Sequence, residues 1–260
     1  MHVPIRIGMI VPSSNTTMET EVPAMLRRHA GASVSPDVEK FTFHSSRMAM
    51  RRVSPEELAR MDAESDRCAA ELSDARCDAL AYACLVAIMA AGPKYHLAAE
   101  ARLTQTAEAN GCTAPVITSA GALVDGIRAL GARRVALVAP YLRPLTQLVV
   151  DYLTDFGIEV VDSISLQVAD NLAVGLLDPM ALPDVAGRLN LSRADAVVLS
   201  ACVQMPSLPA IEVAEQRLGL PVLSAATATV YQILWRLGLS THVPGAGELL
   251  NGRVLSAARA

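Results

Sequence analysis

The stretches Asp78-Ala-Leu-Ala-Tyr-Ala-Cys84 and Asp195-Ala-Val-Val-Leu-Ser-Ala-Cys202 decide the fold of this chain. Each is an apolar run of strand length that begins with Asp and ends with a small residue and Cys, as where a parallel strand passes into a loop and helix. Ligands of open α/β sheets bind outside the carboxyl ends of the strands. The repetition therefore predicts two similar halves whose thiols, Cys84 and Cys202, face each other across one cleft.

Two further pairs of segments repeat along the chain. Arg6-Ile-Gly-Met-Ile-Val-Pro12 is similar to Arg133-Arg-Val-Ala-Leu-Val-Ala-Pro140, and Ala114-Pro-Val-Ile-Thr-Ser-Ala120 is similar to Gly219-Leu-Pro-Val-Leu-Ser-Ala225. Such repetition in a fixed order is typical of a duplicated α/β unit. We therefore predict an α/β fold with two pseudo-symmetric Rossmann-like lobes, each with a four-stranded parallel sheet flanked by helices, and an active site in the inter-lobe cleft.

No linker-like segment separates the two lobes. The boundary is therefore predicted in a helix that crosses between them near residues 119–131, and a final helix over 226–237 makes the return crossing. The first lobe would comprise residues 1–120 plus 226–260, and the second residues 121–225. Lobes joined in this way are expected to pack tightly.

The individual elements follow from apolar periodicity and from capping residues. Strands are predicted over 5–11, 40–43, 78–84, 114–118, 134–139, 158–161, 195–202 and 220–224, with a further extended segment over 164–168. Helices are predicted from near Pro23, over 54–73, 95–110 and 121–130, up to residue 156, and over 180–189, 209–218 and 226–237.

Composition excludes several classes of protein. The 260 residues are 52% hydrophobic and 18% charged, which indicates a compact globular protein. A net charge of -4 with 3% aromatic residues gives neither a basic surface nor a stacking platform, so no nucleic-acid partner is expected. No apolar run reaches bilayer length and no cleavable leader is recognisable, so we expect a cytoplasmic protein that does not bind a membrane.

Metal and nucleotide chemistry find no support in the motifs. The five histidines show no His-x-x-x-His spacing, the five cysteines show no Cys-x-x-Cys spacing, and there is no phosphate-binding glycine loop after a strand. We therefore expect neither a metal nor a cofactor. The odd number of cysteines, without a framework spacing, is typical of reduced thiols.

Cys84 and Cys202 are the candidate catalytic residues. A thiol at a helix start meets unpaired N–H groups and the positive end of the helix dipole, which favour the thiolate and lower its pKa. The alternative is that both are small buried hydrophobic residues, the usual fate of a free cysteine. Their matched positions favour chemistry, whereas Cys68, Cys77 and Cys112 are expected to be structural.

Three polar residues are candidates for binding substrate. Asn15 lies in the Pro12-Ser-Ser-Asn15 loop after the first strand, and its amide can donate to a carboxylate. Tyr141 occupies the equivalent corner of the second lobe, and Asn171 follows an extended segment there. For each, a plain structural interpretation stays open: a helix cap or turn for the asparagines, and an ordinary loop side chain for the tyrosine.

Four segments together resemble the maleate cis–trans isomerases, within the aspartate/glutamate racemase superfamily. They are Ile7-Gly-Met-Ile-Val-Pro-Ser-Ser-Asn-Thr-Thr-Met-Glu-Thr-Glu21, Ala81-Tyr-Ala-Cys-Leu-Val-Ala87, Leu199-Ser-Ala-Cys-Val-Gln-Met-Pro-Ser207 and Ser224-Ala-Ala-Thr-Ala-Thr229. The two-lobed fold is shared with racemases and arylmalonate decarboxylases. The Pro-Ser-Ser-Asn loop together with both cysteines is the part specific to the isomerases, because the decarboxylases keep only the second-lobe cysteine.

The resemblance implies a cofactor-independent reaction on a small dicarboxylate. Cys84 would add to an alkene carbon of maleate, and Cys202 would act as acid and base on the opposite side; rotation and loss of the thiolate would give fumarate. Asn15, Tyr141 and Asn171 would hold the carboxylates. The family also implies a homo-oligomer, a dimer or tetramer, in the catabolism of an aromatic or N-heterocyclic acid such as nicotinate.

Two alternatives remain open at this point. A racemase or an arylmalonate-type decarboxylase on the same fold would use one or both thiols to move a proton at a carbon next to a carboxylate. A two-lobed binding protein would use the cleft without chemistry.

Overall fold

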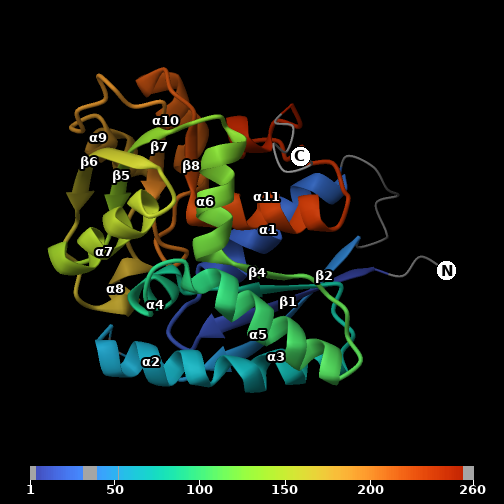
Figure 1. Ribbon diagram of the computed structural model, residues 1–260. Coiled ribbons are helices and arrows are strands. Elements are labelled where there is room, and N and C mark those ends of the chain that lie inside the picture. Colours follow the sequence, from blue (N-terminus) through green and yellow to red (C-terminus); the bar gives the residue numbers. More distant parts are fainter. Residues whose placement is uncertain (1–3, 32–39, 52, 254–260) are drawn as a thin grey trace.

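The computed structural model describes residues 4–31, 40–51 and 53–253. Within these residues the chain forms two separate four-stranded parallel sheets with helices around them (Figure 1). Their strand orders are β2-β1-β3-β4 and β6-β5-β7-β8, so the second sheet repeats the first. This confirms the two-lobed α/β fold predicted from the repeats.

The first sheet is built on β1 (Ile5–Pro12), which lies between β2 (Phe41–Met48) and β3 (Ala79–Tyr82), with β4 (Val116–Thr118) beyond β3. All of β3 is buried, as its unbroken apolar run predicts for a central parallel strand. The helices of this half are α1 (Met18–Gly31), α2 (Pro55–Ala63), α3 (Ser65–Asp74), α4 (Leu85–Ala90) and α5 (Tyr95–Ala109).

The second sheet is built in the same way on β5 (Arg134–Ala139), with β6 (Glu159–Ser165), β7 (Ala196–Ser200) and β8 (Val222–Ser224). Its helices are α7 (Arg143–Thr154), α8 (Asn171–Val174), α9 (Leu182–Ala186) and α10 (Ile211–Leu218), with the short 3-10 turns η1 (Pro179–Ala181) and η2 (Leu208–Ala210).

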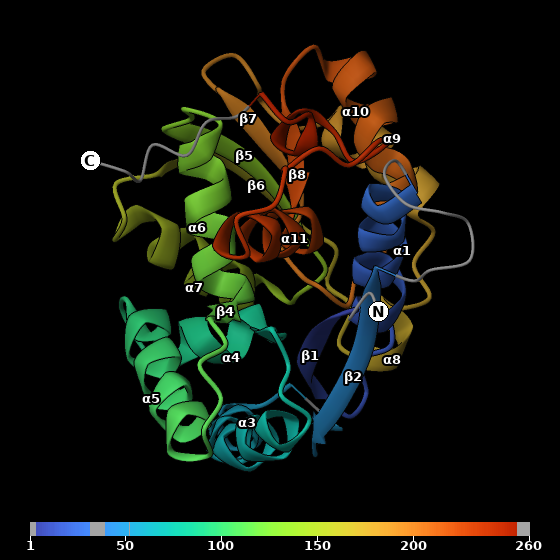
Figure 2. The ribbon, with the colours of Figure 1, turned by 90° about the vertical axis from the view of Figure 1, so that its right-hand side faces the viewer.

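The last strand of each sheet leads into a helix that lies between the two sheets. These helices are α6 (Ser119–Ala129) and α11 (Ala225–Arg236), which run beside each other in the middle of the molecule (Figure 2). Thr118 and Ser224 cap them, and both helices are largely buried. The turn η3 (Glu248–Leu250) then contacts α11. No helix in the described ranges combines the length and apolarity needed to cross a bilayer.

The aspartates that open the two decisive stretches have a clear structural task. The carboxylate of Asp78 accepts the N–H of Arg6 at 2.6 Å, which ties the start of β3 to the start of β1. Asp195 does the same in the second sheet by accepting the N–H of Arg134 at 2.9 Å, and it also pairs with that guanidinium. These contacts with Arg134 lower the pKa of Asp195 to about 2.

The structure corrects several predicted element boundaries. Helix α1 begins at Met18 and not near Pro23, because the side-chain oxygen of Asn15 accepts the Met18 N–H and so fixes the first turn earlier. The helix predicted over 54–73 is divided at Glu64 into α2 and α3. The strand predicted over 158–161 and the extended segment over 164–168 are joined in one strand, β6, which runs from Glu159 to Ser165 and leaves residues 166–168 outside it.

Short elements account for the other differences. The helices α4 and α8, of six and four residues, were not predicted, since neither is long enough to show a helical period. The helix predicted over 180–189 is shorter, and consists of η1 followed by α9.

Candidate active site

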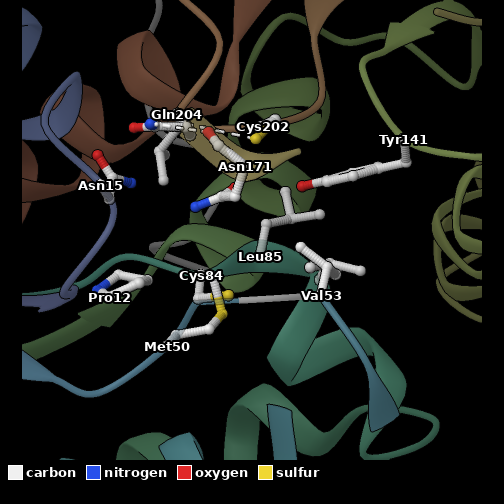
Figure 3. A pocket seen from close by; sticks show the side chains of 12 residues that line it. Pro12, Asn15, Met50, Val53, Cys84, Leu85, Tyr141, Asn171, Cys202 and Gln204 are labelled. Carbon is white, nitrogen blue, oxygen red and sulfur yellow. Dashed lines mark hydrogen bonds between the residues drawn. The ribbon is translucent and has the colours of Figure 1, made fainter. Parts of the chain in front are cut away.

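A single pocket collects every residue proposed from the sequence as catalytic or substrate-binding (Figure 3). It lies at the carboxyl ends of strands from both sheets and encloses about 320 Å³ of space, part of it open to solvent. Cys84 and Asn15 come from the first sheet's half, and Tyr141, Asn171 and Cys202 from the second.

Cys84 follows β3 directly and is the residue before α4, where the backbone turns sharply with φ 159° and ψ 80°. Cys202 lies two residues after β7 and is followed by a turn, not by the helix start expected from the sequence. In that turn Ser200 Oγ donates to the carbonyl of Cys202 at 2.8 Å, and the N–H of Gln204 donates to the Cys202 sulfur at 3.4 Å. In Figure 3 the two thiols lie on opposite sides of the pocket.

The expectation that these thiols have lowered pKa values is wrong. Cys84 and Cys202 are only 7% and 6% exposed, and burial raises both pKa values, that of Cys84 to about 12. The N–H of Ala87 at the start of α4 stabilises the Cys84 thiolate, but less than burial destabilises it. Both residues are therefore thiols at neutral pH. The nearby Cys202 also raises the pKa of Cys84.

Tyr141 lies just beyond β5 and is 5% exposed, with its hydroxyl directed into the pocket (Figure 3). The nearby hydroxyl of Tyr141 lowers the pKa of the Cys202 thiol, although not enough to offset the burial of that thiol. Burial holds the pKa of Tyr141 itself well above its ordinary range. The phenol therefore stays protonated at neutral pH and can donate a hydrogen bond into the pocket.

The two asparagines combine a structural and a pocket-facing role. Asn15 uses its side-chain oxygen on the N–H of Met18, at 3.1 Å, while its amide nitrogen has no hydrogen-bond partner among the described residues. Asn171 opens α8 and donates from its amide nitrogen to the hydroxyl of Ser14 at 2.7 Å. Both side chains are nearly buried in the pocket wall. The cap role of Asn15 is confirmed and leaves its amide nitrogen available to a ligand.

Sequence reasoning missed other residues that shape the pocket, among them Gln204, Met50 and Val53. Met50 and Val53 come from the segment after β2, which Ser13 holds by bonding both the N–H and the carbonyl of Met50. Gln204 lies within the motif Leu199–Ser207, but its side-chain partners are distant in the sequence. No local pattern of the chain indicates that role.

The remaining three cysteines lie in the interior of the protein, away from the pocket. Cys68, Cys77 and Cys112 are buried in the first sheet's half and do not line the pocket. Burial raises the pKa of Cys77 to about 11. Among the described residues, no group of three or more His, Cys, Asp or Glu is arranged to hold a metal ion.

The arrangement suits addition chemistry on a small acidic molecule. Two thiols approach from opposite sides, and neutral donors surround the space between them. Among the described residues that line the pocket, none is Lys, Arg or His. Charge on a ligand would thus be met by amide, phenol and backbone N–H donors held in place by the surrounding structure.

Comparison with known proteins identifies the family of this chain. Residues 7–250 match the arylmalonate decarboxylase family. The chain is 65% identical to a maleate isomerase from Geobacillus stearothermophilus, over 95% of this chain and 98% of that one.

Two solved structures share the fold and most of the length. One is a cysteine-to-alanine variant of the maleate isomerase Iso from Pseudomonas putida S16 with maleate, at 56% identity and TM-score 0.93, covering 96% of this chain and 99% of that one. The other is a cysteine-to-serine variant of the Nocardia farcinica maleate cis–trans isomerase with a covalently bound succinylcysteine intermediate, at 50% identity and TM-score 0.90, covering 96% and 99%.

Proposed function

We propose that this chain, which belongs to the arylmalonate decarboxylase family and within it to the maleate isomerases, converts maleate to fumarate through a covalent adduct on Cys84. The observation that carries the proposal is the single pocket in which a thiol from each half faces the other, with Asn15, Tyr141 and Asn171 between them. A relative that holds a succinylcysteine supports a thiol adduct as the intermediate.

The reaction begins when Cys84 gives its proton to solvent and its sulfur forms a bond to one alkene carbon of maleate. The electron pair of the double bond moves to the other alkene carbon and onto its carboxylate, and Cys202 supplies a proton there, which leaves a succinyl thioether. The former double bond is now single and rotates. Cys202 then takes the proton back, the carbon–sulfur bond breaks, and the double bond re-forms in the trans arrangement.

The donors have a defined task in this scheme. Negative charge moves toward one carboxylate during addition, and a donor aimed at it stabilises the transition state more than the ground state. We assign this task to the free amide nitrogen of Asn15 and to Asn171. Tyr141 stabilises the Cys202 thiolate that forms when this residue has given up its proton, since its hydroxyl already points at that sulfur.

The experiment that tests the proposal follows the alkene protons of maleate by NMR with purified protein and no added metal or cofactor. We expect the maleate signal to be replaced by that of fumarate, and Cys84→Ala to abolish the conversion. Cys112→Ala is the matched control, because that thiol is equally buried but outside the pocket. An unchanged maleate signal, with turnover of an amino acid or an arylmalonate, would contradict the proposal.

The cellular setting extends the proposal. We infer a cofactor-free, cytoplasmic homo-oligomer that removes maleate formed in the breakdown of an aromatic or N-heterocyclic acid such as nicotinate. The similarity to maleate isomerases over nearly the whole chain supports this setting. Size-exclusion chromatography with light scattering measures the oligomeric state, and a monomer would contradict that part.

A further inference from the structure

Gln204 is a buried side chain that connects three separate parts of the pocket wall. It lies two residues after Cys202 and is 3% exposed. Its amide nitrogen donates to the carbonyl oxygens of Ser14 and Asn171, both at 3.1 Å. Its amide oxygen accepts the N–H of Thr16 at 3.1 Å. The nitrogen and the oxygen of one amide group thus form hydrogen bonds to two other segments of the chain.

These contacts reach the groups that carry the proposed chemistry. Ser14 and Thr16 flank Asn15, so Gln204 fixes the backbone on both sides of that donor. The contact with the carbonyl of Asn171 fixes the second donor, and the N–H of Gln204 itself meets the Cys202 sulfur. In Figure 3 this side chain lies behind the space between Asn15 and Asn171.

We propose that Gln204 is a positioning residue that locks the Cys202 turn, the Asn15 loop and Asn171 into one rigid unit across the two halves of the molecule. This inference rests on the proposed function for its kinetic consequence, but the geometry itself does not depend on the substrate. Asparagine would be too short for these contacts, and glutamate would direct a carboxylate at two carbonyl oxygens. Glutamine is therefore the side chain that satisfies all the partners.

A substitution at Gly175 tests this inference in a second and independent way. It ends α8 with ordinary helical angles, so its backbone conformation does not require glycine. An added Cβ, however, would lie 2.7 Å from the amide nitrogen of Gln204 and 3.3 Å from its side-chain carbonyl carbon. Alanine at this position therefore requires a shift, and we expect it to move the end of the Gln204 side chain away from its present position.

Gly187 offers the matched control. It ends α9 with similar angles, and an added Cβ there would meet backbone oxygens of Pro183 and Asp184 at 3.4 and 3.6 Å, which are ordinary contacts. Alanine in place of a helical glycine otherwise tends to stabilise a protein. Gly187→Ala should therefore leave the pocket unchanged.

The test compares Gln204→Met, Gly175→Ala and Gly187→Ala. We expect kcat/KM for maleate to fall about a hundredfold in the first two, as for a small misplacement of reacting groups, and to be unchanged in the third. A Gln204→Glu variant should be equally impaired at neutral pH, and its deficit relative to the wild-type protein at the same pH should narrow as the pH is lowered, because a protonated carboxyl group regains one donor.

A second readout does not need turnover. In a Cys84→Ala background, the pH dependence of Cys202 alkylation by iodoacetamide reports the environment of its sulfur. We expect the alkylation midpoint to move to higher pH in Gln204→Met and Gly175→Ala, because a loosened turn moves the backbone N–H of residue 204 away from the sulfur. The midpoint should not move in Gly187→Ala. If Gln204→Met does not fold, the kcat/KM and the alkylation midpoint of Gly175→Ala test the positioning role of Gln204.

Wild-type midpoints and kinetics in Gly175→Ala would overturn the positioning role. A wild-type protein that leaves maleate unconverted would instead overturn the proposed function, while the alkylation midpoints would still decide the role of Gln204.

Discussion

At the scale of single residues, burial governs the two pocket thiols more than any local donor does. The N–H of Ala87 favours ionisation of Cys84, and the hydroxyl of Tyr141 favours that of Cys202, yet both pKa values are raised. A thiolate is the nucleophile in addition to an alkene. In the proposed mechanism, Cys202 is therefore already protonated and able to act as the acid, whereas the Cys84 thiolate is a minor species.

The rate should accordingly rise with pH. Below the pKa of Cys84, which is about 12, the thiolate fraction grows tenfold for each pH unit. We expect log kcat/KM for maleate to increase with a slope near one between about pH 7 and pH 9. Stopped assays by NMR across this range check it, and a flat profile would contradict a protonated resting thiol.

At the scale of elements, α1 organises both ends of the Cys202 segment. The Asn15 loop precedes this helix and contacts Gln204, while Glu21, one turn into the helix, is buried against Ser207 and Leu208. Its carboxylate accepts the N–H of Ser207 at 2.6 Å and that of Leu208 at 2.7 Å. Burial raises the pKa of Glu21 despite these donors.

Replacement of Glu21 should weaken the fold. Glu21→Ala leaves two buried backbone N–H groups without an acceptor, and we expect the free energy of unfolding to fall by about 3 kcal/mol. Urea denaturation measures it. Glu19→Ala, on the same helix, removes a partly exposed ion pair with Arg47 and should cost less than about 1 kcal/mol. Equal losses in the two variants would contradict the anchoring role of Glu21.

The elements that the sequence predicts well are those with a long and regular pattern. The strand over 134–139 and the helix over 95–110 are found within one residue of their predicted ends. The predicted start of α1 was wrong. Pro23 is a favoured residue in the first turn of a helix, but the hydrogen bond from the Met18 N–H to the Asn15 side chain starts this helix earlier. Neither α4 nor α8 has enough residues to show a period.

At the scale of the whole molecule, the site exists only where the two halves meet. We propose that the lobes comprise residues 1–120 plus 226–260 and residues 121–225, with α6 and α11 between them; residues 1–3, 32–39, 52 and 254–260 lie outside the described residues. The repeats predict the pairing of Cys84 with Cys202, because equivalent strands end at equivalent places. They do not predict the role of Gln204, whose partners are Ser14 and Thr16 in the other half and Asn171 in its own half.

The central claim is that the two thiols divide the chemistry, with attack by Cys84 and proton transfer by Cys202. The most direct test is the intact mass of a Cys202→Ser variant after incubation with maleate, followed by peptide mapping. Serine cannot readily remove the proton that elimination requires, so we predict a mass increase of one maleic acid per chain, located at Cys84 and absent in the Cys84→Ala/Cys202→Ser double variant. No mass increase, or an adduct on Cys68, Cys77 or Cys112, would contradict the account.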